Sequence, residues 1–270
     1  MTIGPLELLW EEDGLPEFAL PGELLRLYGG RFGLDEPLVY ANFVATIDGV
    51  VAIPSIPSAN RLVAGESAAD RFVMALLRAC ADTVLIGSAT MAAAPGSLWT
   101  AEQAYPDAAG AFAELRARLG RTAPPQVAVL TASGLVDPEH PAFRAGAIAL
   151  TTHVGAQRLA ASLTPEAIVP LGADLDPAAA LAALHAQGHR LVLSEGGPHA
   201  IGPFLAERLI DELFLTVSPV LLGRSLADPR LALVEGTDLV VSGPLRGTLA
   251  SVRRDVDHLF VRYRFDAVPK

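Results

Sequence analysis

Short apolar runs alternate along most of the chain with stretches whose apolar residues recur at three- and four-residue intervals. Runs of the first kind predict strands and stretches of the second kind predict helices. The predicted strands are residues 38–47, 83–86, 126–130, 147–151, 167–171, 190–194 and 213–217. The predicted helices are residues 67–81, 177–186 and 198–209, with a partly helical segment at 101–119. This alternation favours a parallel sheet covered by helices.

The pattern changes after residue 224, where the helical spacing stops. Residues 239–242, 248–254 and 258–265 are predicted as antiparallel strands. The expected fold class is therefore α/β, with a single mixed, mostly parallel central sheet flanked by helices and a C-terminal antiparallel hairpin. We expect an N-terminal extension at residues 1–37 that packs on the body, and one domain at residues 38–266.

The segment from 189 to 224 carries the most informative local pattern. Its first strand ends in Glu195-Gly196-Gly197, and Pro198 opens the next helix without losing a hydrogen bond. The two glycines let the backbone turn sharply and let a ligand approach the main chain. The N–H groups of the first helical turn would then favour a phosphate. A plain turn without a ligand explains the same residues equally well, so both interpretations stay open.

Two further predicted strands end in small polar turns, Gly87-Ser88-Ala89-Thr90 and Thr131-Ala132-Ser133. In α/β sheets, ligands bind outside the carboxyl ends of the strands. Three such turns at one edge would form a long groove suited to a dinucleotide. The spacing is not the G-x-G-x-x-G of a Rossmann fingerprint, and no lysine completes a phosphate-binding P-loop.

Charge and single-residue counts narrow the possible functions. The net charge of −10 argues against nucleic-acid binding through the general surface. The only lysine is Lys270 and the only cysteine is Cys80, so internal Schiff-base chemistry, an intramolecular disulfide and a cysteine-rich zinc site are excluded. His185 and His189 are separated by a helix-ending glycine, so we expect no metal site. No apolar run is long enough for a membrane span and no signal peptide is recognisable, so we expect a cytoplasmic protein without a membrane partner.

Two carboxylates stand at predicted strand ends near the groove. Asp48 follows the strand at 38–47, and Glu195 follows the strand at 190–194. Either could donate a proton or orient a substrate amine, and both are candidate catalytic residues. Stabilising a turn is the commoner role for an aspartate before a glycine.

At this point the motifs resemble those of a known family, the C-terminal reductase domain of the bifunctional riboflavin-biosynthesis deaminase–reductase. The resemblance covers about residues 38–265. It rests on ANFVATIDG at 41–49, DRFVMALLRACADTVLIGSAT at 70–90, AVLTASG at 128–134 and LVLSEGGPHAIGPFLAERLIDELFLTVSPVLLG at 191–223. It implies a dihydrofolate-reductase-like fold in a stand-alone form, NADPH as cofactor, and a pyrimidine-type riboflavin precursor as substrate.

The resemblance also implies residue roles. The Glu195 turn would hold the cofactor diphosphate, the Gly87 turn would take the 2′-phosphate side of the adenosine, and the first strand of the body would pass under the nicotinamide. The cofactor-binding residues so implied are Ala45, Thr46, Gly87, Ser88, Ala89, Thr90, Thr131, Ser133, Glu195, Gly196, Gly197 and Pro198. The implied substrate residues are Asn42 and Asp48. Arg61, Arg71 and Arg78 are the basic residues that remain as substrate candidates near the site, and a surface ion pair explains each of them equally well.

Three departures from the family pattern bear on the substrate. Val50 stands where the family often has lysine, Ala75 where it often has histidine, and the segment 98–101 lacks the arginine that meets the substrate phosphate. A dihydropterin such as dihydrofolate, or a cofactor-binding protein with a decayed catalytic site, are therefore the alternatives. We also expect a homodimer, because residues 213–222 and the C-terminal hairpin would leave an exposed sheet edge.

Overall fold

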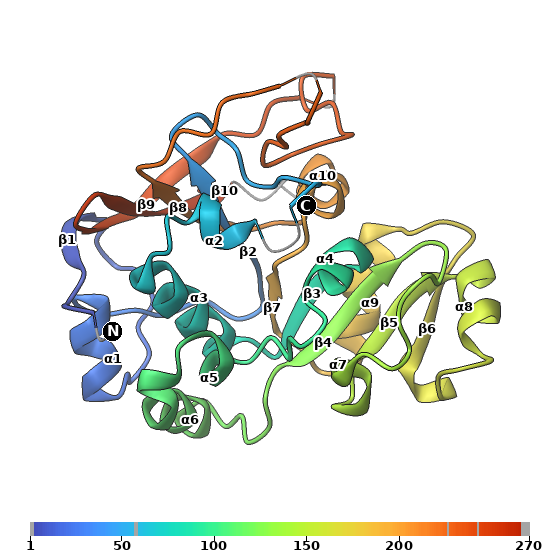
Figure 1. Ribbon diagram of the computed structural model, residues 1–270. Coiled ribbons are helices and arrows are strands. Elements are labelled where there is room, and N and C mark those ends of the chain that lie inside the picture. The colour runs from blue at the N-terminus through green and yellow to red at the C-terminus, as the bar shows by residue number, and fades with distance from the viewer. Residues whose placement is uncertain (1–2, 57–58, 226, 242, 266–270) are drawn as a thin grey trace.

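The computed structural model describes residues 3–56, 59–225, 227–241 and 243–265. A ten-stranded sheet runs through the molecule in the order β1-β9-β10-β8-β2-β7-β3-β4-β5-β6 (Figure 1). The strands from β8 to β6 in this order are parallel, and β1, β9 and β10 join them antiparallel. The strands are β1 (Glu7–Glu11), β2 (Leu38–Thr46), β3 (Thr83–Gly87), β4 (Gln126–Thr131), β5 (Ile148–Thr152), β6 (Ile168–Gly172), β7 (Leu191–Ser194), β8 (Glu212–Ser218), β9 (Gly247–Asp255) and β10 (His258–Phe265).

Helices cover both faces of the sheet. Alternate residues of β2 enter two separate cores: Leu38 and Tyr40 pack with α1, α3, α5 and α6, whereas Val39 and Ala41 pack with α9 and α10. The helices are α1 (Gly22–Tyr28), α2 (Asn60–Val63), α3 (Ala68–Cys80), α4 (Ser88–Ala93), α5 (Ala101–Ala104), α6 (Ala109–Arg118), α7 (Pro141–Arg144), α8 (His153–Leu159), α9 (Pro177–Ala186) and α10 (Pro198–Ala206), with 3₁₀ turns at Pro106–Ala108 and Pro165–Ala167. Within the described ranges, no helix is long and apolar enough to cross a membrane.

The predicted fold class is confirmed: one mixed, mostly parallel sheet is flanked by helices and ends in an antiparallel hairpin. Every predicted strand of the body is present to within two residues at either end. The strand predicted at 239–242 is wrong, because residues 239–241 form a turn, while residue 242 lies outside the described residues. Asp238 accepts hydrogen bonds from the N–H groups of Val240 and Val241, which closes that turn.

The N-terminal segment completes one end of the sheet. Its strand β1 pairs with β9 and was not predicted, because the first thirty-seven residues lack apolar alternation. Leu6, Leu24 and Phe32 from this segment are buried in the core beneath α3 and α6. Arg253 of β9 reaches back to the segment, where it stacks 4.0 Å over the Tyr28 ring and donates to the backbone oxygen of Tyr28.

The reason given for a homodimer is wrong, because β8 is not an edge strand. It lies between β10 and β2 in the interior of the sheet, and β1 covers the outer side of the hairpin. The outermost strands are β1 and β6. Any association through a sheet edge must therefore use one of these two strands.

A buried ion pair joins β8 to β10. Arg262 donates to both carboxylate oxygens of Glu212 at 2.8 and 2.9 Å, and the two side chains are 3% and 5% exposed. The guanidinium also lies 5.2 Å from the centroid of the Phe214 ring. Because both side chains are removed from water, the charge of Arg262 is stabilised mainly by the charge of Glu212, and the reverse.

Glu212→Gln is expected to lower the free energy of unfolding by about 3 kcal/mol, because it leaves the Arg262 charge buried without a counterion. Urea denaturation followed by circular dichroism measures the change. The control is Glu7→Gln, which removes an exposed partner of Arg254 and should lower the free energy of unfolding by less than about 1 kcal/mol. Equal losses in the two variants would contradict the argument.

Candidate functional site

The parallel strands β2, β3, β4 and β7 end at the same edge of the sheet. The three turns singled out in the sequence follow β3, β4 and β7 at this edge, and the turn with Asp48 follows β2. A Cβ built on Gly87 would lie 3.4 Å from the Cβ of Ala200, and one built on Gly196 would lie 3.0 Å from the same atom. The β3 and β7 turns therefore meet at the start of α10.

The reason for glycine differs between the two positions of the Gly196-Gly197 pair. At Gly196 a methyl group would lie 3.0 Å from the Cβ of Ala200, so packing favours a glycine there. Gly197 has φ −67° and ψ 176°, which any residue adopts. A Cβ there would meet only the Thr90 hydroxyl, at an ordinary 3.6 Å. Neither backbone conformation nor packing requires glycine at 197, and the missing side chain leaves the main chain of this turn open to approach.

The helices that begin at these turns lack side-chain caps. Gly87 precedes α4 and Gly197 precedes α10, and neither helix has a side-chain hydrogen bond at its N-cap. In the first turn of α10, Pro198 has no N–H, and the N–H groups of Ala200 and Ile201 donate to the backbone oxygen of Gly197, which leaves the N–H of His199 for another acceptor. A ligand with phosphate oxygens fits this requirement, because its negative charge also faces the positive ends of the helix dipoles.

Glu195 is fixed by a buried ion pair. Arg78 of α3 donates to its two carboxylate oxygens at 2.8 and 2.6 Å, and the two side chains are 8% and 9% exposed. Arg78 also contacts the backbone oxygen of Thr100 at 3.4 Å. The pair ties α3 to the turn after β7. Arg78, expected to bind substrate, thus has Glu195 as its partner.

Asp48 organises the turn after β2. Its carboxylate accepts from the Thr46 hydroxyl at 2.5 Å and from the N–H of Gly223 at 2.7 Å, with longer contacts to the N–H of Leu222. The Thr46 hydrogen bond is the largest influence on the pKa of Asp48 and lowers it, and the two N–H groups lower it further. Asp48 therefore stays ionised and holds residues 222–223 against the end of β2.

The remaining predicted residues fall into different environments. Ala45 and Thr46 are buried at the end of β2, whereas Asn42 is half-buried on the face toward α3. Arg61 on α2 is exposed, and Glu66 lies 3.7 Å from it. Ala89 is exposed and Pro198 is buried.

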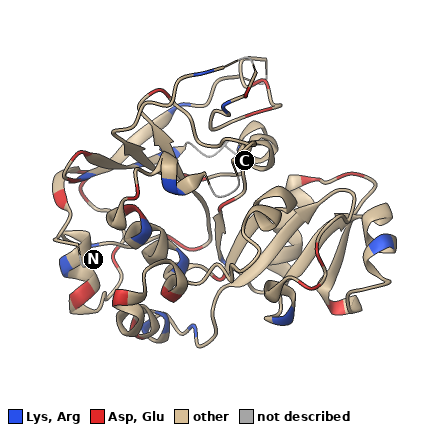
Figure 2. Ribbon diagram, viewed as in Figure 1, with Lys and Arg blue, Asp and Glu red and all other residues tan. Residues whose placement is uncertain are grey.

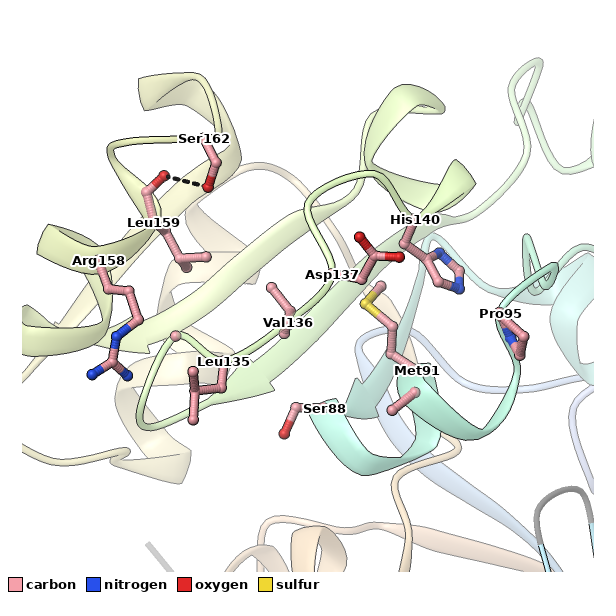
Figure 3. A pocket seen from close by; sticks show the side chains of 12 residues that line it. Ser88, Met91, Pro95, Leu135, Val136, Asp137, His140, Arg158, Leu159 and Ser162 are labelled. Carbon is pink, nitrogen blue, oxygen red and sulfur yellow. Dashed lines mark hydrogen bonds between the residues drawn. The ribbon is translucent and has the colours of Figure 1, made fainter.

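A pocket of about 520 Å³ opens beside the β3 and β4 turns (Figure 3). It is not at Glu195 but farther along the sheet, between α4, the segment after β4, and α8. Its lining residues are Ser88, Met91, Ala92, Pro95, Gly134, Leu135, Val136, Asp137, His140, Arg158, Leu159 and Ser162. The lining is mainly apolar, with few polar groups at its rim, as is usual for a pocket that binds an organic ring.

Arg158 at the rim of the pocket was missed by the sequence reasoning. It extends from α8 and donates to the backbone oxygen of Ser133. The hydroxyl of Thr131 is fully buried, so only Ser133 of the predicted pair is exposed. Arg158 lies twenty-five residues after Ser133 in the chain. The sequence could have identified Arg158 as a site residue only if α8 had been placed beside the turn that follows β4.

The comparison with protein families gives one match. The family of RibD C-terminal domains matches residues 37–258, which is most of the chain. Among curated protein sequences, none is detectably similar.

Solved structures share the fold at low sequence identity. A pyrimidine reductase-like protein from Corynebacterium diphtheriae superposes with a TM-score of 0.66 at 19% identity, over 93% of this chain and 96% of that one. RibD from Acinetobacter baumannii has a TM-score of 0.62 at 20% identity, over 86% of this chain and 59% of that one. The riboflavin biosynthesis reductase Rib7 of Saccharomyces cerevisiae has a TM-score of 0.52 at 14% identity, over 88% and 94%.

Asp48→Asn is expected to lower the melting temperature at pH 7, because the ionised carboxylate is the form that the turn stabilises. A carboxyl whose folded pKa is depressed contributes stability above its unfolded pKa and loses it as the pH falls through the folded value. The difference from the parent protein should therefore shrink below pH 3.8. Thermal melts across pH measure this, with the exposed Asp13→Asn as control. A difference that stays constant down to acid pH would refute the assignment.

Proposed function

The chain belongs to the RibD C-terminal domain family, and from that membership we propose that it is an NADPH-dependent reductase of a pyrimidine-type riboflavin precursor. The observation that supports cofactor binding is Gly197, a glycine that neither backbone conformation nor packing requires. NADPH, when bound, supplies a hydride to an electrophilic C=N carbon.

In this proposal the chain holds the cofactor along the strand ends. The uncapped first turns of α4 and α10 would bind the diphosphate, with Thr90 beside Gly197. The apolar pocket next to Ser88 would accept the adenine ring, and Arg158 would face the 2′-phosphate. The end of β2, with Ala45 and Thr46, would support the nicotinamide.

Two positions of the family pattern that concern the substrate differ in this chain. Val50 and Ala75 stand where the family often carries lysine and histidine, and both are fully buried in apolar cores. Neither position has a charge to offer a substrate phosphate. This favours a second candidate, a dihydropterin without a phosphate group, in the same site.

The test is NADPH oxidation measured with 5-amino-6-(5-phosphoribosylamino)uracil and with dihydrofolate. Turnover of the first substrate supports the proposal, and turnover of only the second supports the alternative. If the protein binds NADPH and reduces neither, it is a cofactor-binding protein with a decayed catalytic site.

Arg158→Gln is expected to reduce the preference for NADPH over NADH by about tenfold, or 1.4 kcal/mol. The Gly87 turn has no acidic residue that would bind a free ribose hydroxyl. Asp137, an acidic residue that lines the pocket, accepts a hydrogen bond from the N–H of Glu139. Figure 2 shows basic residues on α7 and α8 on this side of the molecule, so the matched control is Arg144→Gln on α7, which pairs with Glu139 and does not line the pocket. Equal dissociation constants of the parent protein for both cofactors would overturn the prediction.

Gly197→Val is expected to weaken NADPH binding more than tenfold, about 1.4 kcal/mol, because the branched side chain would occupy the ligand's path. The allowed φ and the open space around its Cβ mean that the fold should tolerate the change. Fluorescence titration measures the affinity, and a melting temperature close to that of the parent protein is the control. Normal NADPH binding by this variant would show that the cofactor lies elsewhere.

A homodimer remains our proposal, now through β1. Leu8, Leu9 and Trp10 on this edge strand are 45%, 46% and 46% exposed, and unpaired edges favour strand addition. Light scattering at micromolar concentration should give the mass of a dimer, and Trp10→Glu should shift it toward a monomer. A monomer mass for the parent protein would refute the proposal.

A further inference from the structure

The pocket beside the β3 and β4 turns has three walls, formed by α4, by the segment 134–140 and by α8. Two of these walls are in very close contact. A Cβ built on Gly155 of α8 would lie 3.0 Å from the backbone nitrogen of Gly134, and one built on Gly134 would lie 2.5 Å from the backbone oxygen of Gly155. Just before this segment, the backbone oxygen of Ala132 accepts from the hydroxyl of Thr152, the N-cap of α8, at 2.7 Å. The segment and α8 are therefore packed as one unit.

His140 joins the third wall, α4, to the segment 134–140. It lines the pocket and is 2% exposed. Its Nε2 donates to the backbone oxygen of Ala94, the residue directly after α4, at 3.0 Å. Its Nδ1 accepts from the N–H of Ala142 at 3.2 Å and thereby caps α7. His140 and Arg158 lie at opposite ends of the pocket lining (Figure 3), so the join with α4 is at the end away from Arg158.

The two contacts of His140 determine where the ring carries its proton. The backbone N–H of Ala142 can only donate, so the Nδ1 that it meets has no proton. The backbone oxygen of Ala94 can only accept, so Nε2 has the proton. The ring therefore uses both nitrogen atoms in one neutral tautomer, with one partner on either side of the pocket end.

The His140 ring also supports the segment that follows α4. Trp99 is 2% exposed, and the centroid of its ring lies 5.7 Å from that of His140, with 34° between the planes. The φ of Trp99 is 51°, in the left-handed region that a bulky residue adopts only where packing holds it. The next residue, Thr100, accepts from Arg78 of the pair with Glu195. His140 thus stands between the pocket and the segment that reaches the Glu195 turn.

The cap on α7 does not by itself explain a histidine at position 140. Serine, threonine, aspartate and asparagine are the usual N-cap residues, because their short side chains place an acceptor beside the first turn. A histidine ring adds a donor on the side opposite its acceptor. At His140 this donor is the atom that reaches Ala94 beyond the end of α4.

We infer that His140 is a positioning residue of the cofactor site, which holds α4 at the separation from the segment 134–140 at which the pocket accepts an adenine ring. The inference rests on the proposed function, in which this pocket takes the adenine and Arg158 faces the 2′-phosphate. His140 acts through α4, by keeping the pocket in its binding shape before the ligand arrives. A ligand that enters a preformed pocket does not bear the cost of ordering its walls.

The first test separates the two contacts of His140. The amide oxygen of an asparagine can replace Nδ1 and cap α7, but this side chain is too short to reach Ala94. The amide nitrogen of a glutamine can replace Nε2 and donate to Ala94. His140→Asn should weaken the binding of adenosine 2′,5′-bisphosphate by roughly fivefold to tenfold, the worth of one hydrogen bond, whereas His140→Gln should stay within about twofold of the parent protein. Isothermal titration calorimetry measures the affinities.

The matched control is His258→Asn. The Nε2 of His258 lies 2.9 Å from the backbone oxygen of Ala64, and His258 does not line the pocket. This variant loses a contact of the same kind and should bind adenosine 2′,5′-bisphosphate as the parent protein does. Parent-like affinity in His140→Asn would overturn the inference. Equal losses in His140→Asn and His140→Gln would also overturn it, because the contact with Ala94 would then not be responsible.

The second test uses the parent protein and does not depend on the stability of a variant. Nitrogen-15 NMR of labelled histidine rings, with the His140 signals identified by their loss in His140→Gln, should show the tautomer with the proton on Nε2. Addition of adenosine 2′,5′-bisphosphate should shift the His140 ring signals and leave those of His258 unchanged. A proton on Nδ1, or a His140 ring that does not respond to the ligand, would overturn the inference.

The probe binds without turnover, so failure of the inference and failure of the proposed function are distinguishable. A parent-like affinity of His140→Asn in an active reductase would refute only the role of His140. The expected loss of affinity in a protein that reduces neither substrate would support the role of His140 in the pocket and refute the proposed reduction. A parent protein that binds neither adenosine 2′,5′-bisphosphate nor NADPH would refute both.

Discussion

The geometry of the site depends on the buried ion pair between Arg78 and Glu195. Glu195 directly precedes the two glycines of the β7 turn, and Arg78 stands in the last turn of α3. The pair therefore sets the distance between the turn and the helix. Because both side chains are removed from water, the loss of either would leave an uncompensated charge. Glu195, a candidate catalytic residue in the sequence, is held here as the counterion of Arg78.

The same pair fixes one end of α3. Arg78 lies in the last turn of that helix, so the helix meets the β7 turn at its C-terminal end. The turns after β3 and β4 lie at the same edge of the sheet as the β7 turn, and the turn with Asp48 follows β2.

The parallel strands and their glycine turns could be predicted from the sequence, because a buried strand of the body is an uninterrupted apolar run and its turn is marked by small residues. The strand β1 could not, since Leu8, Leu9 and Trp10 are consecutive and exposed rather than alternating. In the candidate site, the sheet edge at which the turns meet could be predicted from the parallel arrangement of the strands. The ion pair between Glu195 and Arg78 could not be predicted, because the two residues are 117 positions apart and only the packing of α3 brings them together.

The strand order also determines when the protein can assemble during synthesis. The central strand β2 is made early, yet its two neighbours are β7, which starts at residue 191, and β8, which starts at residue 212. Until those residues have left the ribosome, both edges of β2 lack a partner. Contacts between such distant segments slow folding and prolong the time for which apolar edges are exposed. A nascent chain of this protein therefore remains incomplete at its centre until most of its sequence has been translated.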